Sequence, residues 1–305
     1  MQILHSFAEL SKLPCPVHWA MGFFDGVHLG HRRVIESADT QGTLRGVLTF
    51  MPHPLAYLRP GSEPLLLTPD PDFKAALLRR LNVDVLLVLP FNATLASMSP
   101  QRFIDTLCAS CRVAGISVGS NWHFGKGGAG NADFLRTAAA KGGFRACVND
   151  LLHHGDDTVC SSRIRALLAE GNIETANAML GYPFTICGTV EHGQKLARQL
   201  GFPTANISLP PAAALPAPGV YEVDASINGE QHKGIANVGL RPTIRENEKR
   251  TRLEAHFLNT SQNLYGTSLH VRLRRFIRPE MKFENVTILK KQIERDIASL
   301  TSYLS

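Results

Sequence analysis

The sequence predicts a two-domain α/β protein, with a parallel sheet covered by helices on both faces in its first half and a small antiparallel β-barrel with a terminal helix in its second half. Three observations support this. The length of 305 residues exceeds what one hydrophobic core usually serves. The first half alternates continuous apolar runs with helical patterns, whereas the second half alternates single apolar and polar residues. The turn at 181–183 is the best boundary, so we expect domains at 1–183 and 184–305.

The elements of the first half follow from its apolar runs. We expect strands at 17–21, 46–50, 83–89 and 115–119, and helices at 31–39, 71–81 and 100–111. Ligands of such sheets bind beyond the carboxyl ends of the strands. The loops that follow Met21, Phe50 and Gly119 are therefore where we expect the chemistry.

The second half has the alternation of half-buried strands. We expect strands at 221–227, 230–236, 253–257 and 269–273, and a terminal helix at 286–300 with one apolar stripe. Asn228 and Gly229 are typical of a type I′ hairpin turn between the first two strands. Two short helices split near Gly171 are expected at 163–180, and a loop at 209–218.

Composition and charge narrow the class of protein. Hydrophobic residues make up 44% and charged residues 19%, which excludes a disordered or coiled-coil chain. There is no run of eighteen apolar residues and no pattern of a secretory signal, so we expect a cytoplasmic protein. Its six cysteines lack even spacing and should stay reduced. Cys108 and Cys111 are spaced as in the C-x-x-C motifs of metal sites and redox proteins, but we interpret them as structural residues of a helix.

The most informative segment is GFFDGVHLGH at 22–31, which follows an expected strand and opens a helix. A helix amino terminus presents unpaired N–H groups that attract phosphates. His28 and His31 can add donors to the same anion, and Gly26 and Gly30 let the backbone approach it. The alternatives are that the two histidines form a metal pair or are surface residues.

This segment resembles the H-x-G-H signature of nucleotidylyltransferases, in the version of bacterial bifunctional riboflavin kinase/FAD synthetases. Four further stretches of the first half are similar to that family in the same order: TFMPHP at 49–54, PF at 90–91, FGK at 124–126 and CSSRIR at 160–165. In the second half, GFPTAN at 201–206, GVY at 219–221, ANVGLRPT at 236–243, LYG at 264–266 and IRPE at 277–280 resemble its kinase module. The resemblance covers nearly the whole chain from residue 17.

For the first domain, the resemblance implies a Rossmann-like nucleotidylyltransferase domain in which the FMN phosphate attacks the α-phosphate of ATP, giving FAD and pyrophosphate. It makes His28 and His31 catalytic. It assigns ATP or phosphate binding to Gly22, Phe24, Asp25, Gly26, Gly30, Ser161, Ser162 and Arg165, and flavin binding to Asn121 and Phe124. The alternative is that Ser161 only caps a helix and that Arg165 lies on a solvated helix face.

For the second domain, the resemblance implies phosphorylation of the riboflavin ribityl hydroxyl by ATP with Mg²⁺. Glu254 would accept the hydroxyl proton, and Thr204 and Asn206 would bind the metal. Nucleotide binding is assigned to Gly193, Lys195, Gly201 and Pro203, and flavin binding to Arg241 and Arg278. Alternation places Glu254 opposite Leu253 and Ala255, either on a solvated strand face or at a barrel mouth; the surrounding motifs favour the mouth.

Two alternatives to a bifunctional enzyme stay open. One is that a single module works and the other has degenerated. The other is a basic nucleic-acid-binding protein, suggested by the net charge of +6 and by Arg272, Arg274, Arg275 and Arg278, although no recognition-helix or RNP-like signature accompanies them. We expect small-molecule partners (riboflavin, FMN and ATP), no nucleic acid, no membrane, and a monomer or weak homo-oligomer.

Overall fold

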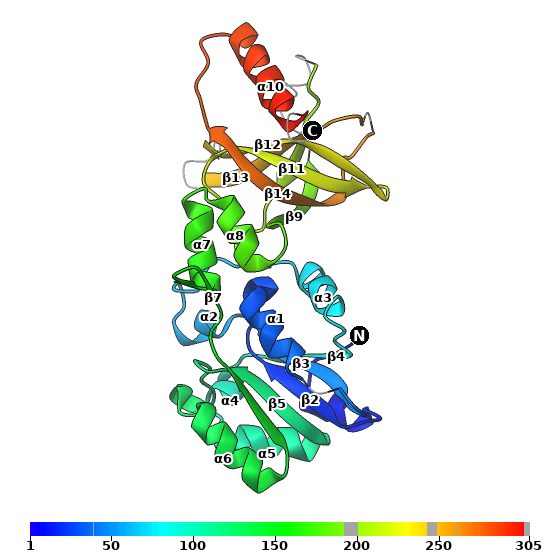
Figure 1. Cartoon of the computed structure of the whole chain (residues 1–305), viewed down its shortest axis with the longest axis vertical. Coiled ribbons are helices and arrows are strands. Elements are labelled where there is room, and N and C mark those ends of the chain that lie inside the picture. The colour runs from blue at the N-terminus through cyan, green and yellow to red at the C-terminus, as the bar shows by residue number, and fades with distance from the viewer. Residues whose placement is uncertain (39, 192–200, 243–248, 261, 302–305) are drawn as a thin grey trace. The chain divides into compact units, whose positions relative to one another are not determined.

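The computed structural model describes residues 1–38, 40–191, 201–242, 249–260 and 262–301. The chain divides into two compact units, Met1–Ser161 and Ser162–Ser305, which we call the first and the second unit (Figure 1).

The first unit is built on a parallel sheet with the strand order β1-β4-β3-β2-β5-β6. Its strands are β1 (Gln2–Leu4), β2 (Val17–Met21), β3 (Leu44–Met51), β4 (Val85–Pro90), β5 (Val113–Gly119) and β6 (Arg145–Asn149). From β2 the chain builds the sheet toward β3 and β4 on one side and later returns to β5 on the other. Ligands of parallel sheets bind at the carboxyl ends of the strands next to such a reversal. The loop after Met21 lies at this point.

Helices cover both faces of this sheet, with α1 and α3 on one face and α5 and α6 on the other (Figure 1). The helices are α1 (Leu29–Glu36), α2 (Pro54–Leu58), α3 (Pro71–Arg79), α4 (Ala93–Ala96), α5 (Pro100–Ser110) and α6 (Ala132–Gly142). Short elements add η1 (Phe7–Lys12), η2 (Asp25–Val27), η3 (Lys126–Gly128), β7 (His153–His154) and β8 (Asp157–Thr158). Trp19 and Leu87 of the strands share one core with Phe103, Leu107 and Leu135 of the helices.

The predicted parallel sheet with helices is confirmed, but two of its strands were not predicted. β1 has only three residues, and β6 carries Arg145 and Asn149 in place of a continuous apolar run. The helix α6 was also missed, although Asn131 is a favourable N-cap and Leu135, Ala138 and Ala139 recur at helical spacing.

The second unit is a closed antiparallel barrel, as predicted, and its strand order is β10-β13-β12-β11-β14-β9. Its elements are α7 (Ser161–Ala169), α8 (Ile173–Leu180), β9 (Thr185–Glu191), β10 (Ala205–Ser208), β11 (Gly219–Ile227), β12 (Glu230–Pro242), β13 (Lys249–Phe257), β14 (Ser268–Pro279) and α10 (Val286–Thr301). The turn between β11 and β12 has Asn228 and Gly229 at φ values of 50° and 88°, which confirms the expected type I′ residues. The apolar stripe of α10 packs against Val220 and Ile235 of the barrel.

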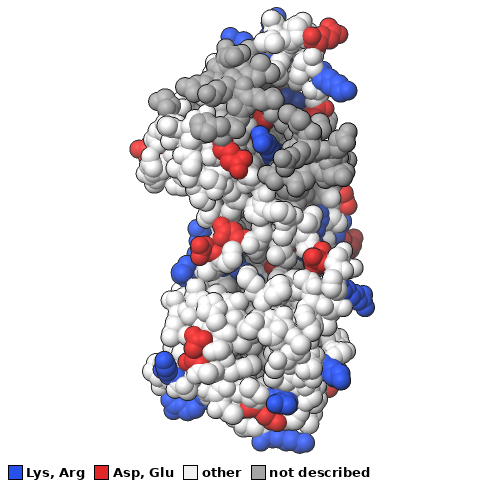
Figure 2. All heavy atoms as spheres, turned by 180° about the vertical axis from the view of Figure 1, so that it is seen from behind, with Lys and Arg blue, Asp and Glu red and all other residues white. Residues whose placement is uncertain are grey.

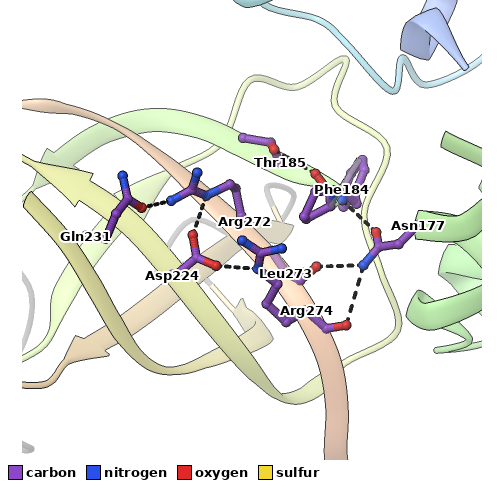
Figure 3. A network of polar contacts seen from close by, with 9 residues as sticks. Asn177, Phe184, Thr185, Asp224, Gln231, Arg272, Leu273 and Arg274 are labelled. Atoms are coloured by element: carbon purple, nitrogen blue, oxygen red, sulfur yellow. Dashed lines mark hydrogen bonds and ion pairs between the residues drawn. The ribbon is translucent and has the colours of Figure 1, made fainter. Parts of the chain in front are cut away.

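The helix α8 is tied to the barrel by Asn177 (Figure 3). The side-chain amide of Asn177 donates a hydrogen bond to the Leu273 carbonyl of β14 at 2.9 Å, and its oxygen accepts one from the Phe184 amide at 2.6 Å. The Leu273 amide in turn donates to the Phe184 carbonyl at 2.8 Å. The expected boundary at 183/184 separates Asn177 from these partners and stays a prediction.

We expect a fragment of residues 162–305 to unfold at a higher temperature than a fragment of residues 184–305. The shorter fragment lacks Asn177 and the apolar face of α8, which includes the fully buried Met179 and Leu180. Loss of the Asn177 hydrogen bonds alone should cost about 1–3 kcal/mol. Thermal unfolding of both fragments measures the difference. In the longer fragment, Asn177→Ala should lower the midpoint and the exposed Glu174→Ala should not, whereas equal midpoints for the two fragments would support the boundary at 183/184.

Candidate functional sites

The loop between β2 and α1 brings two histidines together at the carboxyl end of a central strand. His28 is the N-cap of α1, and its Nδ1 accepts a hydrogen bond from the His31 amide at 3.2 Å. The two imidazole rings are stacked, with centroids 3.5 Å apart and planes 19° apart. Because Nδ1 of His28 is an acceptor, the neutral ring carries its proton on Nε2.

Burial keeps both imidazoles neutral. It lowers the pKa of His28 to about 4. The pKa of His31 is also held well below its usual range, first by burial and then by electrostatic interactions with His28 and Lys74. Nδ1 of His31 is buried and has no hydrogen-bond partner among the described residues. The pair therefore offers neutral N–H donors, which suits the stabilisation of a phosphoryl oxygen.

The backbone of this loop is unusual. Phe24 and Val27 adopt left-handed φ values of 56° and 38°, and Gly26 one of 81°. Residues with side chains rarely adopt this conformation, and Val27 is β-branched, so the surrounding contacts must hold it in place. Gly30 leaves room for the imidazole of His28, since a Cβ there would lie 3.3 Å from that ring.

Asp25 and Ser161 brace the loop from behind. The carboxylate of Asp25 is buried, and its Oδ1 accepts from the backbone amides of Leu67 at 2.8 Å and Thr68 at 3.1 Å. The Gly26 amide donates to the Thr68 hydroxyl at 3.0 Å, and the Ser161 hydroxyl donates to the Asp25 carbonyl at 2.9 Å. Both residues were predicted to bind ATP; the structure gives them contacts that shape the loop.

Lys74 of α3 is a member of this site that sequence reasoning missed. Its ammonium donates to the Phe23 carbonyl at 2.5 Å and to the Thr49 hydroxyl at 3.3 Å, and it lies 4.6 Å from the centroid of the Phe23 ring. Thr49 itself donates to the Phe23 carbonyl at 2.9 Å. A lysine in an amphipathic helix gives no signal of such contacts, because Phe23 lies 51 positions away.

The other predicted residues of this site differ in burial and in the element that carries them. The Gly22 amide donates to the Leu48 carbonyl at 3.2 Å. Asn121 is exposed after β5, whereas Phe124 is buried in the core and stacks on Trp122 with centroids 4.4 Å apart. Ser162 and Arg165 lie in α7 and are grouped with the second unit. Their roles stay predictions.

The second unit contains a cavity of about 530 Å³ between the outer face of the barrel and α10. Its polar lining includes Thr204, Asn206, Asn237, Glu254, His256 and Arg278. Glu254 pairs directly with Asn206 of β10 on one side and with Asn237 of β12 on the other. Residues that face each other across neighbouring strands point to the same face of a sheet. The three side chains therefore form one polar row.

The position of Glu254 differs from the expected barrel mouth. Leu253 and Ala255 are fully buried and fill the barrel interior, so Glu254 between them faces outward. It is nevertheless half-buried, because the cavity that it lines is covered by Leu289 and Ile293 of α10. The apolar stripe of the terminal helix predicts that this helix packs on the barrel, and it does so over this outer face.

The segment that carries Thr204 and Asn206 is fastened to β13. Nδ1 of His256 lies 2.9 Å from the Pro203 carbonyl and donates to it, because a carbonyl oxygen can only accept. The Phe202 ring meets His256 edge-on, with centroids 5.5 Å apart. The side-chain amide of Asn206 donates to the Thr204 carbonyl at 3.5 Å, which leaves Oδ1 as its acceptor.

Arg278 links β14 to α10. Its guanidinium makes an ion pair with Asp296 at 2.8 Å, and Asp296 is only 3% exposed. Arg278 also lines the cavity, so the predicted flavin residue has a structural partner as well. Gly201 is exposed with φ of 93°. Gly193 and Lys195 lie outside the described residues, as does the side chain of Arg241.

The arginines that suggested nucleic-acid binding are paired with carboxylates. Arg272 and Arg274 both contact Asp224 (Figure 3). Arg275 pairs with Glu222 at 3.1 Å, as Arg278 does with Asp296. On the face shown in Figure 2, basic and acidic side chains are interspersed. These four arginines are therefore each paired with a carboxylate, and the expected absence of a nucleic-acid partner stays a prediction. No helix among the described residues has the length and apolarity needed to cross a membrane.

Comparisons with known proteins agree with this two-part arrangement. A family model described as FAD synthetase matches residues 11–163, and one described as riboflavin kinase matches residues 180–304. The chain is 38% identical to the bifunctional riboflavin kinase/FMN adenylyltransferase of Listeria monocytogenes, over 91% of this chain and 89% of that protein. It is 35% identical to the protein of the same name from Escherichia coli, over 97% and 96%.

A solved structure from Streptococcus pneumoniae, titled a macrolide-efflux protein, matches the entire chain over its own entire length, with a TM-score of 0.89 at 27% identity. The similarity to this structure supports the fold over the full length. The two family models and the curated relatives agree in name and in domain order. The chain therefore belongs to the family of bifunctional riboflavin kinase/FMN adenylyltransferases.

Proposed function

We propose that the chain converts riboflavin to FMN in its second unit and FMN to FAD in its first unit, using ATP in both steps. The observation that carries this proposal is that each unit has its own site of the appropriate chemistry. The second unit has a cavity with a carboxylate between two amide side chains, and the first unit has a pair of neutral histidines at a helix amino terminus. A cavity of about 530 Å³ is within the range of small-molecule sites.

In the kinase step, Glu254 accepts the proton of the terminal ribityl hydroxyl. The hydroxyl oxygen then attacks the γ-phosphorus of ATP, the bond to the β-phosphate oxygen breaks, and ADP leaves. The hydrogen bond from His256 to Pro203 keeps the 202–206 segment beside the strand that carries Glu254. The polar row therefore brings the base and the nucleotide-binding segment together.

The residues beside Glu254 fit a magnesium ion that accompanies ATP. Mg²⁺ prefers oxygen ligands and keeps several waters. The Thr204 hydroxyl and Oδ1 of Asn206 are neutral oxygens that line the same cavity as Glu254. A bound ion would neutralise charge on the phosphates, while Thr204 and Asn206 hold the nucleotide in position.

Replacement of Asn206 by alanine should weaken MgATP use in a way that extra magnesium partly restores, because waters can replace one ligand among several. We expect the apparent magnesium requirement of FMN formation to rise, by about tenfold, with a smaller loss of the maximal rate. Titration of magnesium at fixed ATP measures this, and Ser208→Ala on the same strand is the control. A variant with unchanged magnesium dependence would exclude Asn206 as a ligand.

In the adenylyltransferase step, a phosphate oxygen of FMN attacks the α-phosphorus of ATP. The bond between the α-phosphorus and the bridging oxygen breaks, and pyrophosphate leaves. His28 and His31 supply hydrogen bonds to the phosphoryl oxygens as charge develops there. Because their burial keeps the rings neutral near pH 7, they act as donors without becoming acids.

The test is to supply riboflavin, ATP and magnesium and to quantify FMN and FAD separately. Formation of both, with pyrophosphate released in proportion to FAD, supports the proposal. FMN alone or FAD from added FMN alone would favour a single active module. A salt-sensitive shift with an oligonucleotide would favour the binding-protein alternative. Cytoplasmic location and a monomeric or weakly associated state stay predictions.

A further inference from the structure

We propose that Lys74 is a positioning residue for FMN adenylylation, which holds the loop before the histidine pair in place and sets a positive charge beside that pair. The inference rests on the function proposed for the first unit. No sequence motif of the site includes this residue.

The contacts of Lys74 join three parts of the site. From α3, the ammonium reaches the Phe23 carbonyl in the loop after β2 and the Thr49 hydroxyl in β3. Thr49 donates to the same carbonyl, so Phe23 is held from two directions. Phe23 lies between the end of the strand and the left-handed Phe24. Loss of the ammonium would therefore loosen the part of the loop that determines where His28 and His31 stand.

A buried lysine would lower the stability of the folded protein if its role were only to support the loop. Its hydrogen bonds among the described residues go to neutral acceptors, a carbonyl and a hydroxyl. A buried charge without a hydrogen-bonded carboxylate is destabilising, and such groups concentrate at functional sites. A triphosphate bound at the amino terminus of α1 would supply the missing negative charge.

The titratable groups around Lys74 allow the loss of its charge to be followed in a pH profile. Asp25 favours the charged form, but burial outweighs it and lowers the pKa of Lys74 to about 8. The charge of Lys74 is close enough to His31 to lower the pKa of that imidazole, and His28 stacks on His31. The His53 ring lies edge-on to the Phe23 ring, with centroids 4.3 Å apart. His28 and His31 have already lost their charge at pH 7. Lys74 is therefore the member of this group whose charge disappears as pH rises through about 8.

The experiment compares the full-length protein with Lys74→Met and Lys74→Arg, and uses the exposed Lys141→Met as the matched control. The value of kcat/KM for ATP in FAD formation is measured from about pH 6 to pH 10, because this ratio reports the titration of the free enzyme. Riboflavin phosphorylation and the thermal unfolding midpoint are measured on the same samples.

We expect the natural protein and Lys141→Met to lose FAD formation above about pH 8. Lys74→Met should be about 100-fold slower at pH 7 and show no such alkaline decline. Lys74→Arg should recover to within about tenfold of the natural rate, with the decline moved to higher pH, because a guanidinium stays charged. Riboflavin phosphorylation should be the same in all four proteins.

The proposal would be overturned by a Lys74→Met rate within about threefold of the Lys141→Met rate, or by an alkaline decline that persists in Lys74→Met. Equal inactivity of Lys74→Met and Lys74→Arg with lowered unfolding midpoints would also overturn it, since that pattern indicates a purely structural role. Failure of the proposed function itself is distinct, because the natural protein would then make FMN but no FAD.

Discussion

The Glu254→Gln enzyme is expected to lose riboflavin phosphorylation by about 10²–10⁴-fold, the usual contribution of a general base. The amide keeps the shape of the side chain between Asn206 and Asn237 but cannot accept a proton at neutral pH. FMN adenylylation should continue at the natural rate, because the His28 and His31 site belongs to the other unit. The rate of FMN formation from riboflavin, and of FAD formation from added FMN, measures both expectations.

The control for this change is the exposed Glu284→Gln, which removes a carboxylate outside the cavity lining. Magnesium concentration separates the base from a metal ligand, since extra magnesium should partly restore Asn206→Ala and leave Glu254→Gln inactive. A normal rate in Glu254→Gln, or one restored by magnesium, would contradict the role assigned to this carboxylate.

Replacement of either His28 or His31 by alanine is expected to reduce FAD formation by about 10²–10³-fold, the typical loss on removal of one donor to a developing phosphoryl or oxyanion charge. FMN should then accumulate, because the kinase step is untouched. Removing one ring also removes the stack that orients the other, at 3.5 Å between centroids, so the double variant should be little worse than either single one. Product analysis with riboflavin as the only flavin substrate shows both effects.

A cap-preserving variant separates chemistry from folding. Asparagine is a good N-cap, so His28→Asn keeps the helix start but lacks the Nε2 donor. It should be as inactive as His28→Ala and unfold at nearly the natural temperature. The exposed His153→Ala serves as the control. Full FAD formation by His28→Asn would show that His28 acts only as a cap.

Periodicity predicted those elements whose apolar pattern is local. β2 matches the expected 17–21 at both ends, because all five residues are buried and Pro16 and Gly22 flank them. The turn at Asn228 and Gly229 also depends only on adjacent residues. β6 gave no such signal, since its strand position comes from pairing with β5 and not from its own composition.

Site residues were predictable where a motif lies within a few positions, as for His28 and His31 or Thr204 and Asn206. Lys74 and Asn177 were not, because their partners Phe23 and Leu273 are 51 and 96 positions away. For Glu254, alternation correctly separated its side chain from Leu253 and Ala255. The cover over the outer face comes from α10, so strand periodicity alone left the environment of Glu254 undecided.

The left-handed conformations of Phe24 and Val27 carry a consequence for protein engineering. Each such residue costs about 1–3 kcal/mol, which glycine or asparagine would largely avoid. A screen for heat resistance would therefore tend to select glycine or asparagine at these two positions. The same substitutions would give the loop more conformations and blur the placement of the histidine pair. Selection for heat resistance and selection for FAD yield should thus favour different residues at Phe24 and Val27.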